Sequence, residues 1–367
     1  MQSGSATPEG TAAYAARFAG RAAPGHFRAA QGLTVSSIGL GSYLGDPDEA
    51  DDARYREAAA EAILLGCNFI DTAINYRFQR SERALGRALA DATGTGGVLR
   101  QEIVIATKGG YVPFDGGPPA EPRRYFEDTF VRTGVARPED LVSGCHCMTP
   151  AYLEHQLEAS LRNLGLECID VYYLHNPEQQ LDEVERGEFR SRLLAAFERL
   201  EKLAGAGKLR FYGTATWNGY RTEPRAPGHL ALEEIVGAAR EVAGDGHRFR
   251  FVQAPLNLAM PEALVAPTQT LQGRAVSLLE AAERLGVSVV ASASILQGRL
   301  ARSLPEDVSR RLPGLATDAQ RSLQFVRSSP GLASALVGMK RLEHVRENLG
   351  LAEVAPLTPD QFREAFN

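Results

Sequence analysis

Residues 68–89 read NFIDTAINYRFQRSERALGRAL, and this stretch predicts a buried strand followed by a polar loop. The strand-like run at its start leads directly into an acid, Asp71. Five residues further on, Tyr76 stands in a loop that is rich in arginine and other polar groups. An acid at the end of a strand, with a tyrosine just beyond it, is either an ordinary strand end or part of a reactive site.

The rest of the chain repeats this pattern of a short strand and a longer helix. Amphipathic segments lie between the strand-like runs, and their apolar residues recur at the spacing of one helix face. Several of these segments stop at a glycine, such as Gly66, Gly165 and Gly286. The strand-like runs are 36–41, 68–71, 103–107, 170–175, 209–214, 249–255, 287–292 and 333–338.

Strict alternation of strands and helices predicts parallel strands that are joined by helical crossovers. Eight such units in a chain of 367 residues are typical of a closed (β/α)8 TIM barrel, an α/β fold. A doubly wound open sheet is the rival, but it would favour a GxGxxG sequence at its first turn, and none stands there. We therefore expect the barrel.

Two of the connections between predicted elements of the barrel are unusually long. Residues 109–149 are rich in glycine, proline and aromatic residues, and a shorter irregular segment covers 256–273. Both follow strands, so both should rise from the C-terminal face, where barrels of this kind carry their sites. We expect one domain over 31–367, preceded by an N-terminal extension, 1–30, that is flexible or loosely docked.

Composition excludes several classes of function. The 40 basic and 45 acidic residues are spread along the chain, so no nucleic-acid partner is expected. No apolar run approaches the length of about 18 residues that spans a bilayer, so no membrane anchor is expected either. The four cysteines are too few for a disulfide framework and favour a cytoplasmic location. The run Cys145-His146-Cys147 lacks a second pair of ligands, so we expect no metal there and interpret it as a loop or a site wall.

Reactive residue types meet at the predicted strand ends. Asp71, Lys108, His175 and Gln253 each stand at or near the end of a strand, and Tyr76 follows closely. Only four of the 40 basic residues are lysine, which makes a lysine at a strand end more notable. Each residue alone has an ordinary structural explanation, but their convergence on one barrel mouth favours a reactive site.

Such a group suits proton transfer to an oxygen atom. A free tyrosine has a pKa of about 10, and a neighbouring ammonium would lower that pKa. A carboxylate would hold the ammonium in place, and a histidine would add an orienting hydrogen bond. Because no side chain can supply a hydride, reduction of a carbonyl by this group implies a nicotinamide cofactor.

The chain also resembles the aldo/keto reductases, over about residues 34–350. The segments that carry the resemblance are GLGSYLG at 39–45, 68–89 as quoted above, IATKGG at 105–110, DVYYLHNP at 170–177 and VGMKRLEHVRENL at 337–349. The resemblance implies reduction of an aldehyde or ketone by NADPH. It places the catalytic tetrad of that family on Asp71, Tyr76, Lys108 and His175.

The same resemblance implies where the cofactor binds. Cations near the adenosine 2′-phosphate would favour NADPH over NADH. The implied cofactor-binding residues are Thr216, Gln253, Leu296, Gln297, Gly298, Arg299, Leu300, Lys340, Arg341, His344, Glu347 and Asn348.

Two positions depart from the family pattern. Ser292 replaces the aromatic residue that stacks on the nicotinamide, and Ala215 replaces a serine that grips the carboxamide. Either another aromatic residue takes over the stacking, or the cofactor binds weakly. The candidates are Trp217, Tyr111 and Phe114.

Two other functions remain open at this stage. The chain could be a cofactor-sensing or interaction protein on the same barrel, similar to the ion-channel accessory subunits of the family, as the missing stacking residue suggests. It could also be a lyase or aldolase that uses Lys108 as a Schiff-base amine. The acid and the tyrosine expected beside that lysine favour its charged form, which argues against the last reading.

Overall fold

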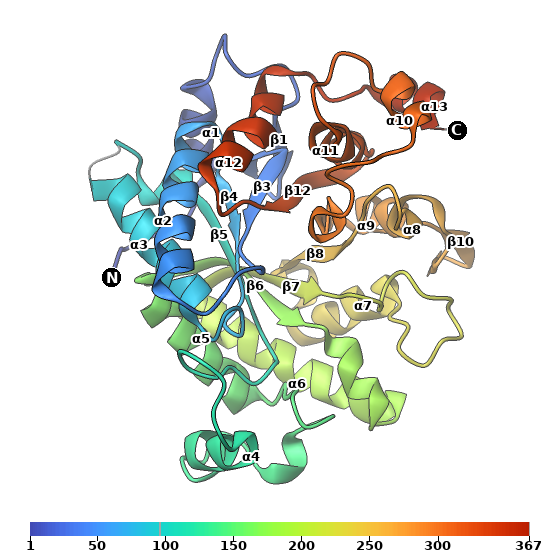
Figure 1. The fold of residues 1–367 in the computed structure, drawn as a ribbon. Helices are drawn as coiled ribbons and strands as arrows, with labels where there is room; N and C mark the ends of the chain where they lie inside the picture. Colours follow the sequence, from blue (N-terminus) through green and yellow to red (C-terminus); the bar gives the residue numbers. More distant parts are fainter. Residues whose placement is uncertain (95–96, 367) are drawn as a thin grey trace.

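The computed structural model describes residues 1–94 and 97–366, and its centre is a closed barrel of eight parallel strands (Figure 1). The strands run round the barrel in the order β11-β12-β3-β4-β5-β6-β7-β8. The predicted TIM barrel is confirmed, and all eight predicted strands are present with ends within two residues of those expected. Their bounds are β3 (Ile38–Gly41), β4 (Phe69–Asp71), β5 (Val104–Gly109), β6 (Ile169–His175), β7 (Leu209–Ala215), β8 (Phe249–Pro255), β11 (Ser288–Ser292) and β12 (Leu332–Gly338).

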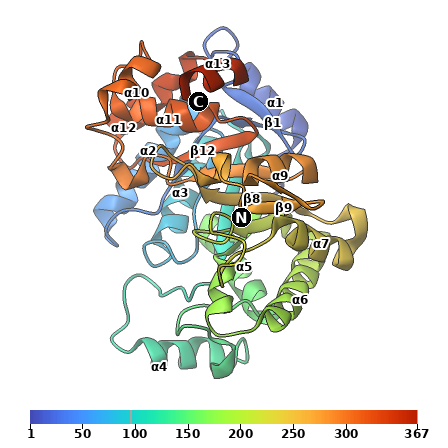
Figure 2. The ribbon, with the colours of Figure 1, turned by 90° about the vertical axis from the view of Figure 1, so that its right-hand side faces the viewer.

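Helices follow the barrel strands and form the outer layer (Figures 1 and 2). Local sequence sets their ends: the Asp48 side chain caps the start of α2, and Gly165 and Gly286 adopt the left-handed conformation that closes α5 and α9. The helices are α2 (Glu49–Leu64), α3 (Arg80–Gly94), α5 (Pro150–Leu164), α6 (Arg186–Gly205), α7 (Leu232–Ala243), α9 (Leu278–Leu285), α10 (Glu306–Arg311), α11 (Asp318–Ser328), α12 (Leu342–Leu349) and α13 (Pro359–Phe366). No helix within the described ranges is long and apolar enough to span a membrane.

Strand alternation explains why the reactive side chains share the barrel interior. Phe69, Ala106 and Tyr173 belong to the apolar cluster inside the barrel, whereas their strand neighbours belong to the cluster under the helices. Successive side chains on a strand face opposite sides, so the residue two positions further along faces inward as well. Asp71 and Lys108 are therefore the next inward layer, at the C-terminal ends of their strands.

The N-terminal segment is packed against the barrel, which corrects the expectation of a flexible or loosely docked extension. It contains α1 (Pro8–Ala16) and a hairpin of β1 (Phe27–Ala30) with β2 (Leu33–Ser36). The Ala6 amide donates to Asp170 Oδ1 at 2.6 Å, and Asp170 also pairs with Arg100 at 2.8 Å in the buried interior. Tyr14 is only 1% exposed. The segment thus covers the end of the barrel opposite the candidate site.

The two long connections contain more regular structure than their composition indicated. In 109–149, α4 (Pro122–Phe126) continues into a wide helical turn over 127–131, and the pair stands below α5 and α6 in both views (Figures 1 and 2). In the segment from 256, which we expected to be irregular, α8 (Glu262–Val265) precedes a hairpin of β9 (Gln269–Leu271) and β10 (Arg274–Val276).

Candidate active site

A cavity of about 1090 Å³ opens at the C-terminal ends of the barrel strands. Its lining comes from almost every strand end, because the strands of a barrel converge on one mouth. The predicted residues Asp71, Tyr76 and His175 line it, and Lys108 lies behind Asp71. The structure therefore brings the four residues of the expected tetrad together, as the spacing of the strand ends required.

Lys108 and Asp71 form a buried ion pair beneath the cavity. Lys108 Nζ donates to Asp71 Oδ1 at 2.5 Å and to the Thr72 carbonyl at 2.7 Å. The second carboxylate oxygen accepts from Gln253 Nε2 at 2.8 Å. Lys108 and Asp71 are only 1% and 3% exposed, so both charges are held in fixed positions away from bulk water.

Tyr76 reaches the cavity from a strained loop after β4. The next three residues, Arg77 to Gln79, all adopt left-handed backbone conformations, with φ between 48° and 69°. Arg77 stabilises this turn, since its guanidinium donates to the Asp46 carbonyl at 2.9 Å and to Asp52 at 2.6 Å. The Tyr76 ring centroid consequently lies 5.0 Å from Lys108 Nζ.

The electrostatics of Tyr76 differ from the sequence-based expectation. Burial, and after it the charge of Asp71, raises the pKa of Tyr76 well above its ordinary value, whereas we expected Lys108 to lower it. Burial is the largest cause of the rise, and the Lys108 ammonium is directed at Asp71 and Thr72. Tyr76 is thus protonated at neutral pH, which is the form that a proton donor needs.

His175 completes the group from the end of β6. Its ring lies edge-on to Tyr76 at 5.8 Å and to Tyr111 at 5.0 Å, between ring centroids. Burial, together with the charge of Lys108, lowers the pKa of His175 well below its usual range. A neutral imidazole beside a phenol can hold the oxygen of a substrate by a hydrogen bond without adding charge.

A chain of hydrogen bonds behind His175 was not predicted from the sequence. Arg192 donates to Gln180 Oε1 at 2.6 Å, which orients the amide so that its Nε2 donates to His146 Nδ1 at 2.8 Å. His146 must then carry its proton on Nε2, which donates to the His175 carbonyl at 2.8 Å. His146 is buried, and burial lowers its pKa to about 4. It thereby fixes the backbone of His175.

No group of three or more histidine, cysteine or acidic side chains within 1–94 and 97–366 is placed to hold an ion. Cys147 is buried and contacts the Thr149 hydroxyl, while Cys145 is half-buried and is a free thiol.

Most of the predicted cofactor residues line the same cavity. They are Thr216, Gln253, Gln297, Gly298, Lys340, Arg341, His344, Glu347 and Asn348. Leu296, Arg299 and Leu300, also predicted, are not among the lining residues. Thr216 Oγ1 and Asn348 Oδ1 are buried and have no hydrogen-bond partner in the described part of the chain. Unpartnered polar atoms on a cavity wall fit a polar ligand such as a dinucleotide.

Two of the three aromatic residues proposed to replace the missing stacking ring reach the cavity. Trp217 and Tyr111 line it, and Phe114 does not. Asn176 Nδ2 donates to the Tyr111 hydroxyl at 3.0 Å, which holds Tyr111 beside His175. Trp217 is 40% exposed, and its backbone amide donates to Glu178 Oε1 at 3.0 Å. Tyr43, which the sequence analysis did not single out, packs edge-on against Tyr76 with ring centroids 5.0 Å apart.

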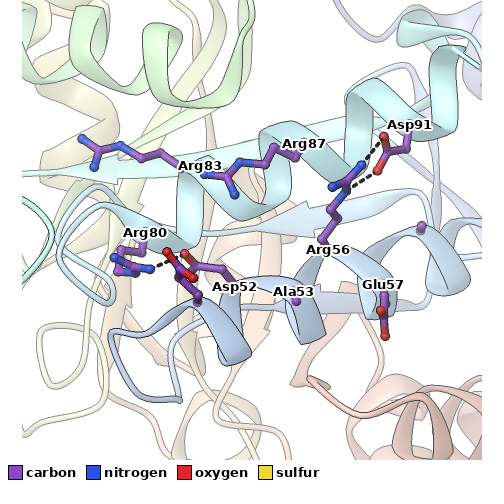
Figure 3. A pocket seen from close by; sticks show the side chains of 10 residues that line it. Asp52, Ala53, Arg56, Glu57, Arg80, Arg83, Arg87 and Asp91 are labelled. Carbon is purple, nitrogen blue, oxygen red and sulfur yellow. Dashed lines mark hydrogen bonds and ion pairs between the residues drawn. The ribbon is translucent and has the colours of Figure 1, made fainter.

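A second hollow, of about 620 Å³, lies between α2 and α3 (Figure 3). Arginines and acids line it in equal numbers. Arg80 pairs with Asp52 at 2.7 Å, and Arg56 pairs with Asp91 at 2.5 Å. Because the charges of the lining residues balance one another, we interpret this hollow as the gap between the polar faces of α2 and α3.

Comparison with known proteins agrees with this fold. Residues 37–225 match the model of the aldo/keto reductase family. The uncharacterized oxidoreductase YqkF of Bacillus subtilis is 24% identical over 335 residues, covering 90% of this chain and 92% of its own length. A putative voltage-gated potassium channel subunit beta of Schizosaccharomyces pombe is also 24% identical, covering 92% and 90%.

Solved structures give the same result for the fold. An aldo/keto reductase from Klebsiella pneumoniae, crystallised with NADP and acetate, superposes with a TM-score of 0.59 at 22% identity. The match covers 91% of this chain and 92% of that one. Because the family model spans more than half of the sequence, the chain belongs to the aldo/keto reductase family.

Proposed function

We propose that this protein reduces an aldehyde or ketone to an alcohol with NADPH, and that Tyr76 is the proton donor. The observation that carries the proposal is the buried Lys108–Asp71 pair directly beneath Tyr76 and His175 at the cavity floor. Burying two charges costs free energy unless both are well hydrogen-bonded. The position of this pair beneath the strained loop that carries Tyr76 therefore favours a chemical role over a purely stabilising one.

In this proposal NADPH supplies the hydride, and the protein supplies the proton and the orientation. The substrate carbonyl oxygen would accept hydrogen bonds from the Tyr76 hydroxyl and the neutral His175 ring. Tyr76 donates its proton as negative charge develops on that oxygen. Lys108 Nζ lies 5.0 Å from the centroid of the Tyr76 ring, and in this proposal its charge offsets part of the negative charge that the ring carries after proton transfer. Asp71 keeps that ammonium charged and in place.

We further propose that Trp217 covers the nicotinamide ring in place of the aromatic that Ser292 lacks. Both residues line the cavity, and Tyr111 is already held beside His175. Glu178 supports this placement, since one of its oxygens accepts from the backbone amides of Trp217, Asn218 and Gly219 at 3.0–3.1 Å. These three hydrogen bonds to one carboxylate oxygen fix the backbone of the loop that carries the Trp217 indole.

The second candidate is a cofactor-sensing or interaction protein without turnover. The similarity to a protein named as a channel beta subunit favours it, as does the serine at 292. The intact arrangement around Tyr76 favours the enzyme. Whichever applies, four free cysteines are in keeping with a cytoplasmic location.

A carbonyl panel with NADPH oxidation as the readout tests the proposal. We expect consumption of NADPH by at least one aldehyde or ketone, with stoichiometric alcohol formation. Tight NADPH binding without turnover on any aromatic, aliphatic or sugar aldehyde would favour the second candidate. Trapping of a substrate on Lys108 by borohydride would instead indicate Schiff-base chemistry.

A further inference from the structure

An ion pair lies at the edge of the cavity where the cofactor adenosine is expected. Lys340 follows β12 and lines the cavity, and its Nζ donates to Asp51 Oδ2 at 2.6 Å. Asp51 is in the first turn of α2, far from Lys340 in sequence. The Asp51 side chain is only 2% exposed, and that of Lys340 is 28% exposed. The cation expected to read the 2′-phosphate is therefore already paired with an acid of the protein.

The surroundings of Asp51 fix its carboxylate in place. The Asp46 amide donates to Oδ2 at 2.7 Å, and Arg54 donates to Oδ1 at 2.8 Å. Gly45 makes room for it, since a Cβ at that position would stand 2.6 Å from Oδ2 and its φ of 130° suits glycine. Burial raises the pKa of Asp51, but hydrogen bonds from Lys340, Asp46 and Arg54 lower it more, and the resulting pKa is about 2. Asp51 is thus ionised at every working pH.

The other basic side chains at this edge lack a buried carboxylate partner in the described part of the chain. Arg341 and His344 are exposed and line the cavity, and Arg341 is 3.7 Å from the exposed Glu343. A pair of exposed charges at that distance contributes little. Lys340 therefore differs from its neighbours in that a phosphate must compete with a rigid carboxylate for its ammonium.

We propose that Asp51 limits the preference of this protein for NADPH over NADH, because its carboxylate competes with the 2′-phosphate for Lys340. This inference rests on the proposed use of a nicotinamide cofactor at this site. Asp51 acts through Lys340, so it is a positioning residue. NADH, whose ribose carries a hydroxyl at that position, leaves the ion pair intact.

The test compares dissociation constants of NADPH and NADH, measured by fluorescence titration of the full chain without substrate. Asp51→Asn keeps the shape and the acceptor for the Asp46 amide but removes the charge. We expect the affinity ratio of NADPH to NADH to rise about tenfold in this variant, mostly through tighter NADPH binding. Glu61→Gln is the matched control: Glu61 is also on α2 and pairs with Arg346 of α12 at 2.8 Å, away from the cavity lining.

The double variant Asp51→Asn with Lys340→Met keeps the proposal testable if the single variant does not fold. It removes both charges, so we expect the ratio to stay within about threefold of the parent. A tenfold fall in the double variant would show that Lys340 serves the phosphate in spite of Asp51 and would overturn the inference. An unchanged ratio in folded Asp51→Asn would do the same. If the parent binds neither nucleotide, the proposed function itself fails.

Discussion

Replacement of Lys108 by methionine tests whether the buried ion pair is as tightly coupled as its geometry indicates. Methionine keeps most of the apolar stem and removes the ammonium that lies 2.5 Å from Asp71. Asp71 then remains in the interior with Gln253 as its hydrogen-bond donor. Removing one partner of a buried pair costs about 3–5 kcal/mol, and the remaining donor places the expected loss at about 3 kcal/mol of unfolding free energy.

The pH dependence of the loss follows from the pKa of Asp71. Burial raises that pKa, and the charge of Lys108 opposes the rise. In Lys108→Met the opposing charge is gone, so the folded-state pKa of Asp71 lies still further above its unfolded value. Such a group stabilises the fold at low pH and loses that contribution as pH rises. The variant should therefore be closest to the parent in stability at acidic pH and furthest from it at neutral pH.

A double-mutant cycle measured by urea unfolding, followed by circular dichroism, provides the assay. Asp71→Asn combined with Lys108→Met should lose clearly less than the sum of the single losses, by about 1–2 kcal/mol, since no charge is left unpaired. Lys202→Met is the control, because Lys202 pairs with Glu198 at 2.7 Å with both side chains exposed. It should cost under about 1 kcal/mol. A loss below about 1 kcal/mol for Lys108→Met, or additive losses, would refute the reasoning.

The remaining predictions concern the cofactor, the support of His175 and the response to acid. Trp217→Ala should weaken NADPH and NADH binding equally, by about 1–3 kcal/mol of stacking, and Ser292→Tyr should bring no gain; tighter binding by Ser292→Tyr in fluorescence titrations would contradict this. Gln180→Leu removes the hydrogen bond that orients His146, so it should lower kcat with little change in cofactor affinity. An unchanged kcat would show that His146 does not support His175 in catalysis. Burial lowers the pKa of His26 from its ordinary 6.5 to about 4. The free energy of unfolding should therefore fall as the pH drops from 6.5 to about 4, by up to about 3 kcal/mol. His26→Gln should show a shallower fall in urea titrations at each pH.

Much of the barrel could be predicted because each strand is a short apolar run between amphipathic helices, and this local pattern repeats eight times. The N-terminal hairpin, β1 with β2, escaped prediction because it lies outside the repeating strand–helix pattern and follows an Ala- and Arg-rich segment. The packing of that segment depends on partners such as Asp170, which is 164 residues away from Ala6 in sequence.

In the candidate site, too, only the features with a local sequence pattern could be predicted. Asp71, Lys108 and His175 could be brought together from sequence because strand ends of a barrel meet at one face. The pairing of Lys340 with Asp51 could not, since it joins residues 289 apart and leaves no local pattern. The direction of the Tyr76 pKa shift could not be predicted either, since it is set mainly by the burial of the side chain, which residue spacing does not determine.

The most direct test of the proposed mechanism is the rate of carbonyl reduction by Tyr76→Phe on a substrate that the parent protein turns over. Phenylalanine keeps the ring beside Lys108 and His175 and removes only the hydroxyl. Loss of a positioned acid costs roughly 10²–10⁴-fold in rate, so kcat should fall by that factor while the dissociation constant of NADPH stays within a few-fold of the parent. Reduction by Tyr76→Phe at the rate of the parent protein would contradict the account.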